Sequence, residues 1–201
     1  AKYWAMCEWF DITCGELMDY IDKKGQTENT IFVYVCDNGW VQNENDGAYN
    51  PISKQSPYDF GLRTPIMYKW KGKITPGMDT LSLTSSLDMV PTVLELLGME
   101  RPKELDGINV LDDNEVKSRE AVFGEIYNHD FNTIEEGLKY RMVMTNPYKL
   151  IVPDPKNRPN EKIQLYNIFK DPFEQVNLAD ERPEVVDDLR NKLEASWNPK
   201  L

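Results

Sequence analysis

The sequence is poor in several residue types that would identify a compartment or a partner. Its three cysteines, Cys7, Cys14 and Cys36, match neither a disulfide framework nor a zinc or redox motif, so they do not indicate a compartment. Basic residues number 23 against 34 acidic ones, which gives a formal net charge of −11. Because nucleic acids are held mainly through their phosphates, this charge disfavours a nucleic-acid partner.

Long apolar runs are also missing. The longest, residues 31–36 and 93–97, are far shorter than the roughly 20 residues of a membrane-spanning helix, so no membrane span is predicted. No secretory signal opens the chain, because Lys2, Glu8 and Asp11 interrupt the apolar stretch that a signal needs. The same absence is expected of a chain that begins inside a longer protein. A content of 40% hydrophobic and 11% aromatic residues is typical of a globular protein with a core.

The first third of the chain predicts a helix followed by a strand. Apolar residues at intervals of three and four form one stripe, with Gly25 as the stop, and these residues are Tyr3, Met6, Phe10, Cys14, Leu17 and Ile21. Residues 31–36 are β-branched and aromatic without alternation, as expected for a strand covered on both faces. A helix that leads into a buried strand favours an α/β fold.

The middle of the chain predicts a long loop between regular elements. Residues 37–61 show no period, and a loop of roughly 25 residues in a compact domain indicates a functional role. A short strand is predicted at 65–70. A helix is predicted from Asp88, as its cap, to Gly98, with Pro91 in the first turn.

The last third predicts a sheet with one helix across it. Candidate strands at 121–127, 140–145, 149–152 and 163–168 follow one another closely, which favours an antiparallel arrangement. The helix predicted for 183–197 places one apolar face on that sheet, made by Val185, Leu189, Leu193 and Trp197.

Polar residues follow directly after the predicted strand at 31–36. By themselves Asp37-Asn38-Gly39 are typical of a turn. The alternative is that the Asp37 carboxylate and the Asn38 amide oxygen bind a hard cation such as Ca²⁺. Calcium takes about 6 to 8 oxygen ligands, so the others would have to come from elsewhere.

Several blocks of the sequence, in the same order, resemble the sulfatase family. The segment 29–39 (NTIFVYVCDNG), with the helix before it, is similar to the family's metal-binding strand, and 54–65 (KQSPYDFGLRTP) to its lysine, Tyr-Glu-Gly-Gly, arginine and proline stretch. Further similar blocks are 70–74 (WKGKI), 86–98 (SLDMVPTVLELLG) and 165–179 (LYNIFKDPFEQVNLA). The resemblance therefore covers nearly the whole chain.

The resemblance implies a calcium-dependent hydrolase of the alkaline phosphatase superfamily that cleaves sulfate esters with a formylglycine nucleophile. Asp37 and Asn38 fall where the family has two calcium ligands, and Lys54 where it has a lysine that binds the sulfate. A divalent cation and a fixed ammonium can stabilise the negative charge that develops on the sulfuryl oxygens. The implied fold is α/β: residues 1–118 form part of a mixed-sheet sandwich, and residues 119–201 a small antiparallel sheet with a helix.

The chain also departs from the family pattern. The nucleophile motif Cys/Ser-X-Pro/Ala-X-Arg is absent, and only 36 residues precede Asp37. We therefore expect the C-terminal portion of a sulfatase, inactive and weak in calcium binding when isolated, with the formylglycine in a missing N-terminal half. That half, and a sulfated small molecule or sugar, are the expected partners. Apolar edges left exposed without it favour self-association. Phe60 stands where the family has a glycine.

Two further residues are candidates for binding the substrate. Arg63 matches a family arginine, and the alternatives for it are contact with an anion and an ion pair with an acidic neighbour such as Asp59, of which we favour the ion pair. His129, the only histidine, follows a predicted strand between Asn128 and Asp130. A histidine in such a turn is typically polar surface, with a substrate contact as the alternative.

Two other functions stay open at this point. One is a phosphodiesterase or phosphoryl-transfer member of the same superfamily, because the same charge stabilisation serves phosphate. The other is a non-catalytic interaction domain. The reading frame upstream would separate them, since each enzyme class needs its own nucleophile motif there. Family members are commonly periplasmic, extracellular or lysosomal, but nothing in this sequence indicates a compartment.

Overall fold

The computed structural model describes residues 2–43 and 47–197, and the chain divides into two compact units. The first comprises residues up to 36 together with 65–79, and the second comprises residues 37–64 together with those from 80 onward. The loop after residue 36 therefore belongs to the same unit as the C-terminal sheet. The sequence-based division at residue 118 stays a prediction.

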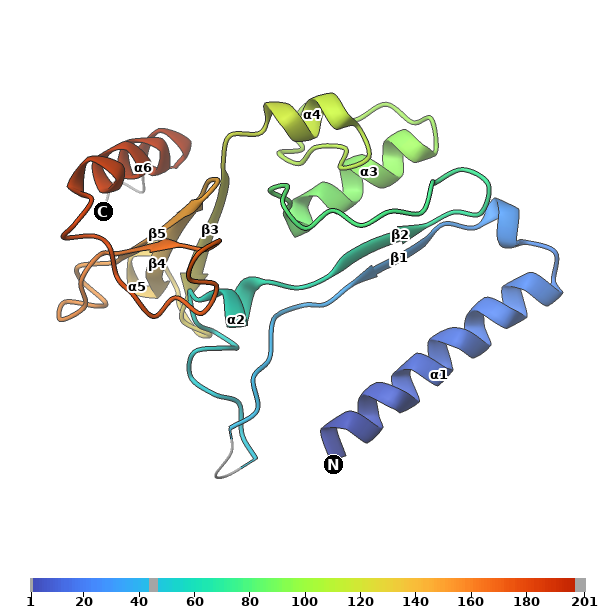
Figure 1. Ribbon diagram of the computed structural model, residues 1–201, viewed down its shortest axis with the longest axis horizontal. Helices are drawn as coiled ribbons and strands as arrows, with labels where there is room; N and C mark the ends of the chain where they lie inside the picture. Colours follow the sequence, from blue (N-terminus) through green and yellow to red (C-terminus); the bar gives the residue numbers. More distant parts are fainter. Residues whose placement is uncertain (1, 44–46, 198–201) are drawn as a thin grey trace. The chain divides into compact units, whose positions relative to one another are not determined.

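The first unit combines one long helix with a pair of strands. Helix α1 (Lys2–Lys23) confirms the predicted helix, and the turn after it contains Gly25, whose positive φ of 66° suits glycine. After η1 (Thr27–Asn29), strand β1 (Phe32–Val35) pairs antiparallel with β2 (Ile66–Lys69) (Figure 1). The rings of Phe10 and Tyr34 lie 6.0 Å apart, and the Trp70 indole donates to the Glu28 carbonyl at 2.8 Å.

The expectation that β1 is covered on both faces is wrong for the residues described. Phe32, Tyr34 and Val35 are half-buried and Val33 is exposed at 36%, because a two-stranded ribbon and one helix leave much of the strand surface open. Helix α1 buries none of its residues, and Trp4 and Trp9 are each 72% exposed. This unit therefore presents a large apolar surface.

In the second unit, a buried ion pair joins the helical segment to the start of the C-terminal sheet. The segment contains η2 (Ser86–Asp88), α3 (Met89–Leu96) and α4 (Asp113–Ser118). Asp88 occupies the expected cap position before α3, but its side chain makes no capping hydrogen bond to that helix. Its carboxylate instead binds the Arg119 guanidinium at 2.6 and 2.7 Å and accepts bonds from the backbone N–H groups of Ser85 and Ile108.

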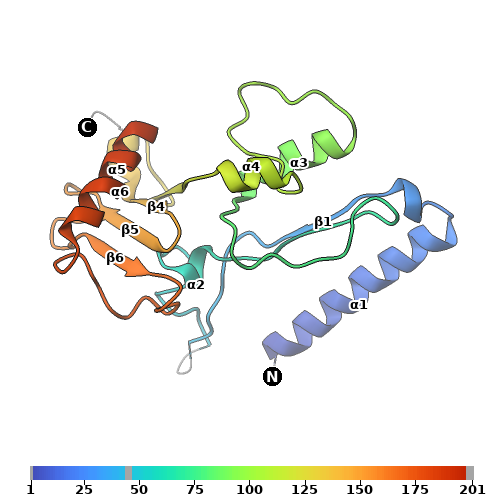
Figure 2. The ribbon, with the colours of Figure 1, turned by 45° about the horizontal axis from the view of Figure 1, so that its top comes forward.

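The C-terminal sheet has the strand order β3-β4-β5-β6, with every neighbouring pair antiparallel. The strands are β3 (Val122–Tyr127), β4 (Leu138–Met144), β5 (Tyr148–Pro153) and β6 (Gln164–Asn167), with α5 (Ile134–Gly137) between β3 and β4. Helix α6 (Pro183–Ser196) lies against β4 and β5 (Figure 2). The predicted strands, their antiparallel pairing and the last helix are confirmed, and helices with antiparallel sheets agree with the α/β class.

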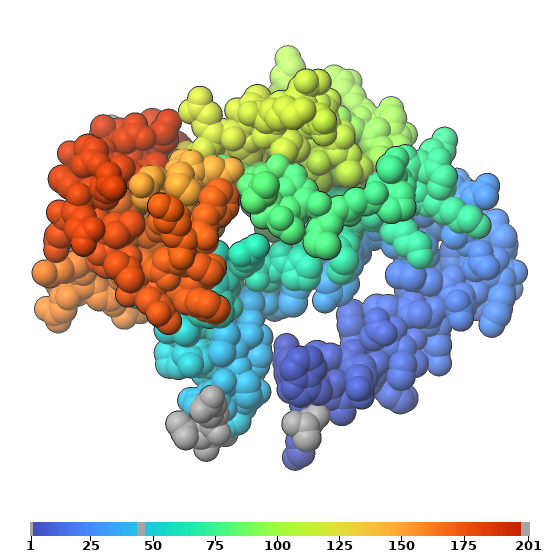
Figure 3. All heavy atoms as spheres, in the orientation of Figure 1, coloured from blue at the N-terminus to red at the C-terminus, as the bar shows by residue number. Residues whose placement is uncertain are grey.

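Both faces of this sheet are buried, and by different elements. One core cluster joins the sheet to α6 and consists of Val143, Leu150, Val152, Leu165, Leu189 and Leu193. The other lies on the opposite face and consists of Tyr140, Met142, Ile151 and Tyr166, with Tyr58 of the long loop packed against it. The atoms of β5, β6 and α6 form one continuous mass, orange to red in Figure 3. The sheet is thus the platform on which the long loop rests.

Within the described residues, no helix combines the length and the apolar character needed to cross a membrane. This includes α1, which carries acidic residues along its length.

Candidate functional site

The first two predicted site residues, Asp37 and Asn38, follow β1 with one residue, Cys36, in between. Asp37 is exposed and Asn38 is half-buried. The Asn38 side-chain amide donates to the carbonyl of Gly39 at 2.8 Å, which fixes the orientation of that amide. Consecutive residues therefore carry a carboxylate and an amide oxygen, which are hard donors by type.

A close contact between two glycines joins this segment to the loop that carries Lys54. The Gly39 N–H donates to the Gly61 carbonyl at 2.8 Å, and a Cβ atom on Gly39 would overlap the carbonyl of Phe60. A Cβ on Gly61 would in turn overlap the carbonyl of Ser53. Only glycine allows backbones to approach this closely. Ser53, the residue before Lys54, and the Asp37–Gly39 segment therefore both pack on the short helix that contains Gly61.

That helix is α2 (Asp59–Leu62), and the turns before it hold Lys54 in place. The buried Ser53 hydroxyl donates to the Asn50 carbonyl at 2.7 Å, and the Ser56 N–H donates to the Ser53 carbonyl at 3.0 Å. Lys54 itself is half-buried. In the part of the chain that the structure describes, no carboxylate forms an ion pair with the Lys54 ammonium, which leaves it suited to an anionic ligand.

Two of the predicted residues lie apart from this arrangement. Arg63 and His129 are exposed, and no hydrogen bond or ion pair of their side chains is found among residues 2–43 and 47–197. The expected ion pair of Arg63 with Asp59 is wrong, because the Asp59 carboxylate binds Lys149 at 2.8 Å. Arg63 meets Asp59 only through its backbone N–H, which donates to the Asp59 carbonyl.

Sequence reasoning missed the most deeply buried charges near the site. Lys149 in β5 is fully buried, and its ammonium lies 2.8 Å from the Asp59 carboxylate and 2.7 Å from the Glu174 carboxylate. The second oxygen of Glu174 accepts a hydrogen bond from the Asp59 N–H at 2.6 Å. We call Asp59, Lys149 and Glu174 the buried triad.

The electrostatics of the buried triad follow from its composition. Two carboxylates share one ammonium in a low-dielectric site, so burial raises the pKa of Glu174 while the Lys149 ammonium opposes that shift. A signal for the triad was present in the sequence. Lys149 interrupts the apolar run of β5, which has paired strands on both sides, so its side chain must enter one of the two cores.

Aromatic side chains line the same contact between the loop and the sheet. The hydroxyls of Tyr58 and Tyr166 donate to the Gln164 side-chain oxygen at 3.0 and 2.7 Å, and burial raises the pKa of Tyr166. The rings of Phe60 and Phe173 stack at 5.7 Å. Phe60, at the position where the family has a glycine, therefore packs onto the residue that precedes Glu174.

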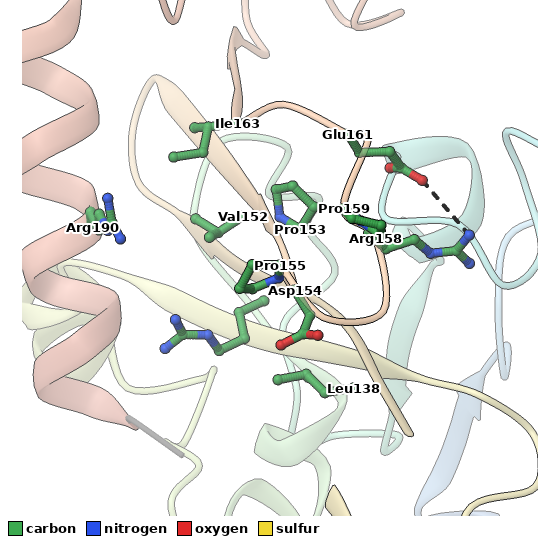
Figure 4. A pocket seen from close by; sticks show the side chains of 11 residues that line it. Leu138, Val152, Pro153, Asp154, Pro155, Arg158, Pro159, Glu161, Ile163 and Arg190 are labelled. Atoms are coloured by element: carbon green, nitrogen blue, oxygen red, sulfur yellow. Dashed lines mark ion pairs between the residues drawn. The ribbon is translucent and has the colours of Figure 1, made fainter. Parts of the chain in front are cut away.

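The described residues do not by themselves make a metal site. Within residues 2–43 and 47–197, no three His, Cys, Asp or Glu side chains come close enough together to hold an ion. A concavity of about 350 Å³ lies elsewhere, between the turn from β5 to β6 and α6, and Asp154, Arg158 and Arg190 are among its lining residues (Figure 4). None of the predicted site residues lines it, and Arg158 there pairs with Glu161 at 3.7 Å.

Comparison with known proteins identifies what the chain is similar to. Residues 47–198 match the sequence family described as N-sulphoglucosamine sulphohydrolase, C-terminal. The chain is 28% identical to arylsulfatase K of Bos taurus, over 100% of this chain and 37% of the relative. It is 27% identical to N-acetylgalactosamine-6-O-sulfatase of Bacteroides thetaiotaomicron, over 92% of this chain and 40% of the relative.

A solved structure shows the same similarity in three dimensions. A sulfatase from work on glycosaminoglycan metabolism by Bacteroides thetaiotaomicron superposes with a TM-score of 0.72 at 26% identity, over 93% of this chain and 42% of that chain. The α/β fold is therefore that of part of a sulfatase. The chain spans about two fifths of the length of the relatives that it matches.

Proposed function

Since this chain belongs to the family of N-sulphoglucosamine sulphohydrolase C-terminal regions, we propose that it is the C-terminal portion of a calcium-dependent sulfuric ester hydrolase acting on a sulfated sugar. The family match over residues 47–198 is the observation that carries the proposal, because it includes Lys54, the buried triad and the whole sheet. The name of one relative, an N-acetylgalactosamine-6-O-sulfatase, favours a sulfated amino sugar as the substrate class.

The donor set after β1 is compatible with calcium. Asp37 and Asn38 offer hard oxygen donors, which calcium prefers, but two residues are too few for its usual 6 to 8 ligands. In this proposal both residues hold the ion and an N-terminal half supplies the rest. The bound ion would reduce the negative charge on the sulfate oxygens.

The role proposed for Lys54 follows from its charge and its fixed backbone. As the sulfate ester is cleaved, negative charge develops on the sulfuryl and leaving oxygens. An ammonium already in position stabilises that charge without rearranging. The turns at residues 50–56 and the contact of Ser53 with Gly61 supply that position. The nucleophile, a formylglycine, belongs to the N-terminal half in this proposal.

The surface of the first unit supports an N-terminal half as the partner. Helix α1 exposes Trp4, Trp9 and Phe10, and β2 exposes Met67. So many large exposed apolar side chains on one helix and the neighbouring ribbon favour a protein interface. Because the chain covers about two fifths of its relatives, we propose that the rest of the same polypeptide covers this surface.

The proposal is tested on the longer protein encoded by the same reading frame. It should hydrolyse an aryl sulfate, while the isolated 201-residue chain should not. Lys54→Ala in the longer protein should lower kcat/KM by about 100-fold or more, the usual cost of losing one such group. Lys162→Ala, at an exposed lysine in the turn before β6, is the matched control and should leave turnover unchanged.

Other outcomes would support other functions. Faster hydrolysis of a phosphodiester than of an aryl sulfate would favour the phosphodiesterase alternative. A reading frame without any upstream nucleophile motif would favour a non-catalytic interaction domain. Turnover of an aryl sulfate by the isolated chain would contradict the proposed division of the site between two halves.

A further inference from the structure

The buried triad connects three segments that are far apart in the sequence. Asp59 lies 90 residues before Lys149 and 115 residues before Glu174. Glu174 is 7% exposed and takes up a positive φ of 52°, which is uncommon for a residue other than glycine. The chain therefore adopts an unfavourable backbone conformation at the residue whose carboxylate reaches Lys149 and α2.

Stability of the sheet alone does not require these charges. Replacing a buried ion pair by apolar side chains of similar volume is often neutral or stabilising, because each buried charge loses its hydration. An apolar pair cannot, however, accept the hydrogen bond from the Asp59 N–H or pair with its carboxylate. What the ionic groups add is one fixed position for the first residue of α2.

The position of α2 determines the position of the candidate site residues. Gly61, two residues after Asp59, contacts Gly39 on one side and Ser53 on the other without room for a Cβ atom. A shift of α2 would therefore move the Asp37–Gly39 segment and the Lys54 turn along with it. The stacked rings of Phe60 and Phe173 add a second link between α2 and the segment that contains Glu174.

We propose that Glu174, acting through Lys149 and the Asp59 N–H, is a positioning residue that fixes the loop carrying Lys54 relative to the Asp37–Gly39 segment. The expected effect of Glu174 on catalysis rests on the proposed function, whereas its expected effect on the position of the loop does not. Glu174 touches no candidate substrate-binding group, so it acts on the reaction only through the loop. Residues 165–179, which have no role in the proposed sulfate chemistry, thereby have a role in positioning the loop through Glu174.

The test compares variants of the longer protein by hydrogen exchange and kinetics. Glu174→Leu keeps the volume but removes both interactions, and Glu174→Gln keeps an acceptor for the Asp59 N–H. Val143→Ala weakens the other core of the same sheet, at a fully buried residue facing α6, and is the matched control. The readouts are amide exchange in peptides covering residues 50–62, the melting temperature, and kcat and KM for an aryl sulfate.

The proposal predicts a local effect. Glu174→Leu should raise exchange at residues 50–62 by at least about tenfold through local opening, and Glu174→Gln should restore much of the protection. Glu174→Leu should also lower kcat/KM by more than Val143→Ala does at an equal loss of melting temperature. If the Leu variant does not fold, Lys149→Met tests the other side of the same contact with the same readouts.

A purely structural role would give a different result. Exchange would then rise equally in the sheet and in the loop, and activity would follow the melting temperature in both Glu174→Leu and Val143→Ala. That result would overturn the proposal. Failure of the unmodified protein to cleave sulfate esters would instead remove the proposed function, while the exchange data would still decide whether Glu174 positions the loop.

Discussion

A lysine in the middle of a buried strand keeps its charge only when carboxylates meet it inside the protein. Lys149 meets two, and the three groups come from β5, α2 and the segment after β6. Removing one partner of a buried ionic group is costly because the others remain buried without compensation. Lys149 therefore links the long loop to the sheet through Asp59 of α2.

Truncating that lysine should be more damaging than replacing it by an apolar side chain of similar length. Lys149→Ala should lower the free energy of unfolding by about 3–5 kcal/mol, because it leaves two buried carboxylates unpaired and a cavity behind them. Lys149→Met should cost less, since it fills the space. Urea denaturation of both variants measures the difference in their free energies of unfolding. Equal losses would show that the missing charge, and not the cavity, determines the loss of stability.

The titration of Glu174 predicts a pH dependence with a definite sign. Its pKa is raised in the folded chain above the usual 4.5, so the folded state binds the proton more tightly than the unfolded state. The contribution of Glu174 to stability is thus largest below 4.5 and falls as the pH rises towards the folded pKa. The groups that face it are Lys149 on β5, Asp59 on α2 and Tyr166 on β6.

Glu174→Gln removes this titration. The stability of the variant relative to the unmodified chain should therefore rise with pH from about 4.5 upward, and urea unfolding of both proteins between pH 4 and pH 8 measures it. A difference that falls with rising pH would mean that the Lys149 ammonium outweighs burial and holds the pKa of Glu174 low.

At the residue scale, the sequence predicted candidates but not their partners. Asp37, Asn38 and Lys54 were selected by their order in a family-like pattern, and their roles stay predictions. The partner of Asp59 was expected at Arg63, four residues away, whereas the structure has it at Lys149. Contacts over 90 residues depend on how the sheet packs, and local spacing carries no information about that.

At the scale of secondary-structure elements, a second buried ion pair, between Asp88 and Arg119, joins the helical segment to the C-terminal sheet. Asp88 is fully buried and Arg119 nearly so, and the guanidinium meets both carboxylate oxygens. Because Asp88 also accepts two backbone hydrogen bonds, it organises the start of α3 and the chain near Ile108 together. Asp88 occupies the predicted cap position of α3, but its side chain binds this long-range partner and makes no capping hydrogen bond to that helix.

Loss of the Asp88–Arg119 ion pair should lower the free energy of unfolding. Arg119→Leu leaves the Asp88 carboxylate buried without its cation and should lower the free energy of unfolding by about 3–5 kcal/mol. Lys117→Ala, which removes an exposed pair with Asp113, is the control and should change it by less than about 1 kcal/mol. Chemical denaturation measures the free energy of unfolding of both variants. Similar losses in the two variants would contradict a stabilising role of the Asp88–Arg119 ion pair.

The regular elements themselves were largely predictable from the sequence. Residue periodicity located α1, β1, β2, the four strands of the sheet and α6 to within a few residues, because each has a clear period or a β-branched run. The short helices α2, α4 and α5 were not predicted. They are only four to six residues long and are held by tertiary contacts, so no pattern of their own identifies them.

At the scale of the whole molecule, apolar surface is the dominant feature of the first unit. The sequence predicted the apolar stripe of α1, together with exposed apolar surface in a chain that lacks the N-terminal half. In the structure Met6, Phe10 and Leu17 of that stripe are more than half exposed. No periodicity argument can tell which partner covers a helix face, because the pattern is the same for a core and for an interface.

The isolated chain should therefore associate with itself. Sedimentation velocity should show oligomers at micromolar concentration, since exposed aromatic surface is removed from water on association. Trp4→Lys combined with Trp9→Lys should shift the distribution towards monomer. The matched control is Lys2→Ala with Lys23→Ala, which changes charge on the same helix. A double tryptophan variant that associates as strongly as this control would rule out the apolar surface of α1 as the site of self-association.

Calorimetric calcium titration of the longer protein measures whether Asp37 and Asn38 hold calcium together with ligands from outside this chain. We predict one calcium ion bound by the longer protein, an affinity weakened by about tenfold or more in Asp37→Ala, and weak or absent binding by the isolated chain. Unchanged affinity in Asp37→Ala, or tight binding by the isolated chain, would contradict it.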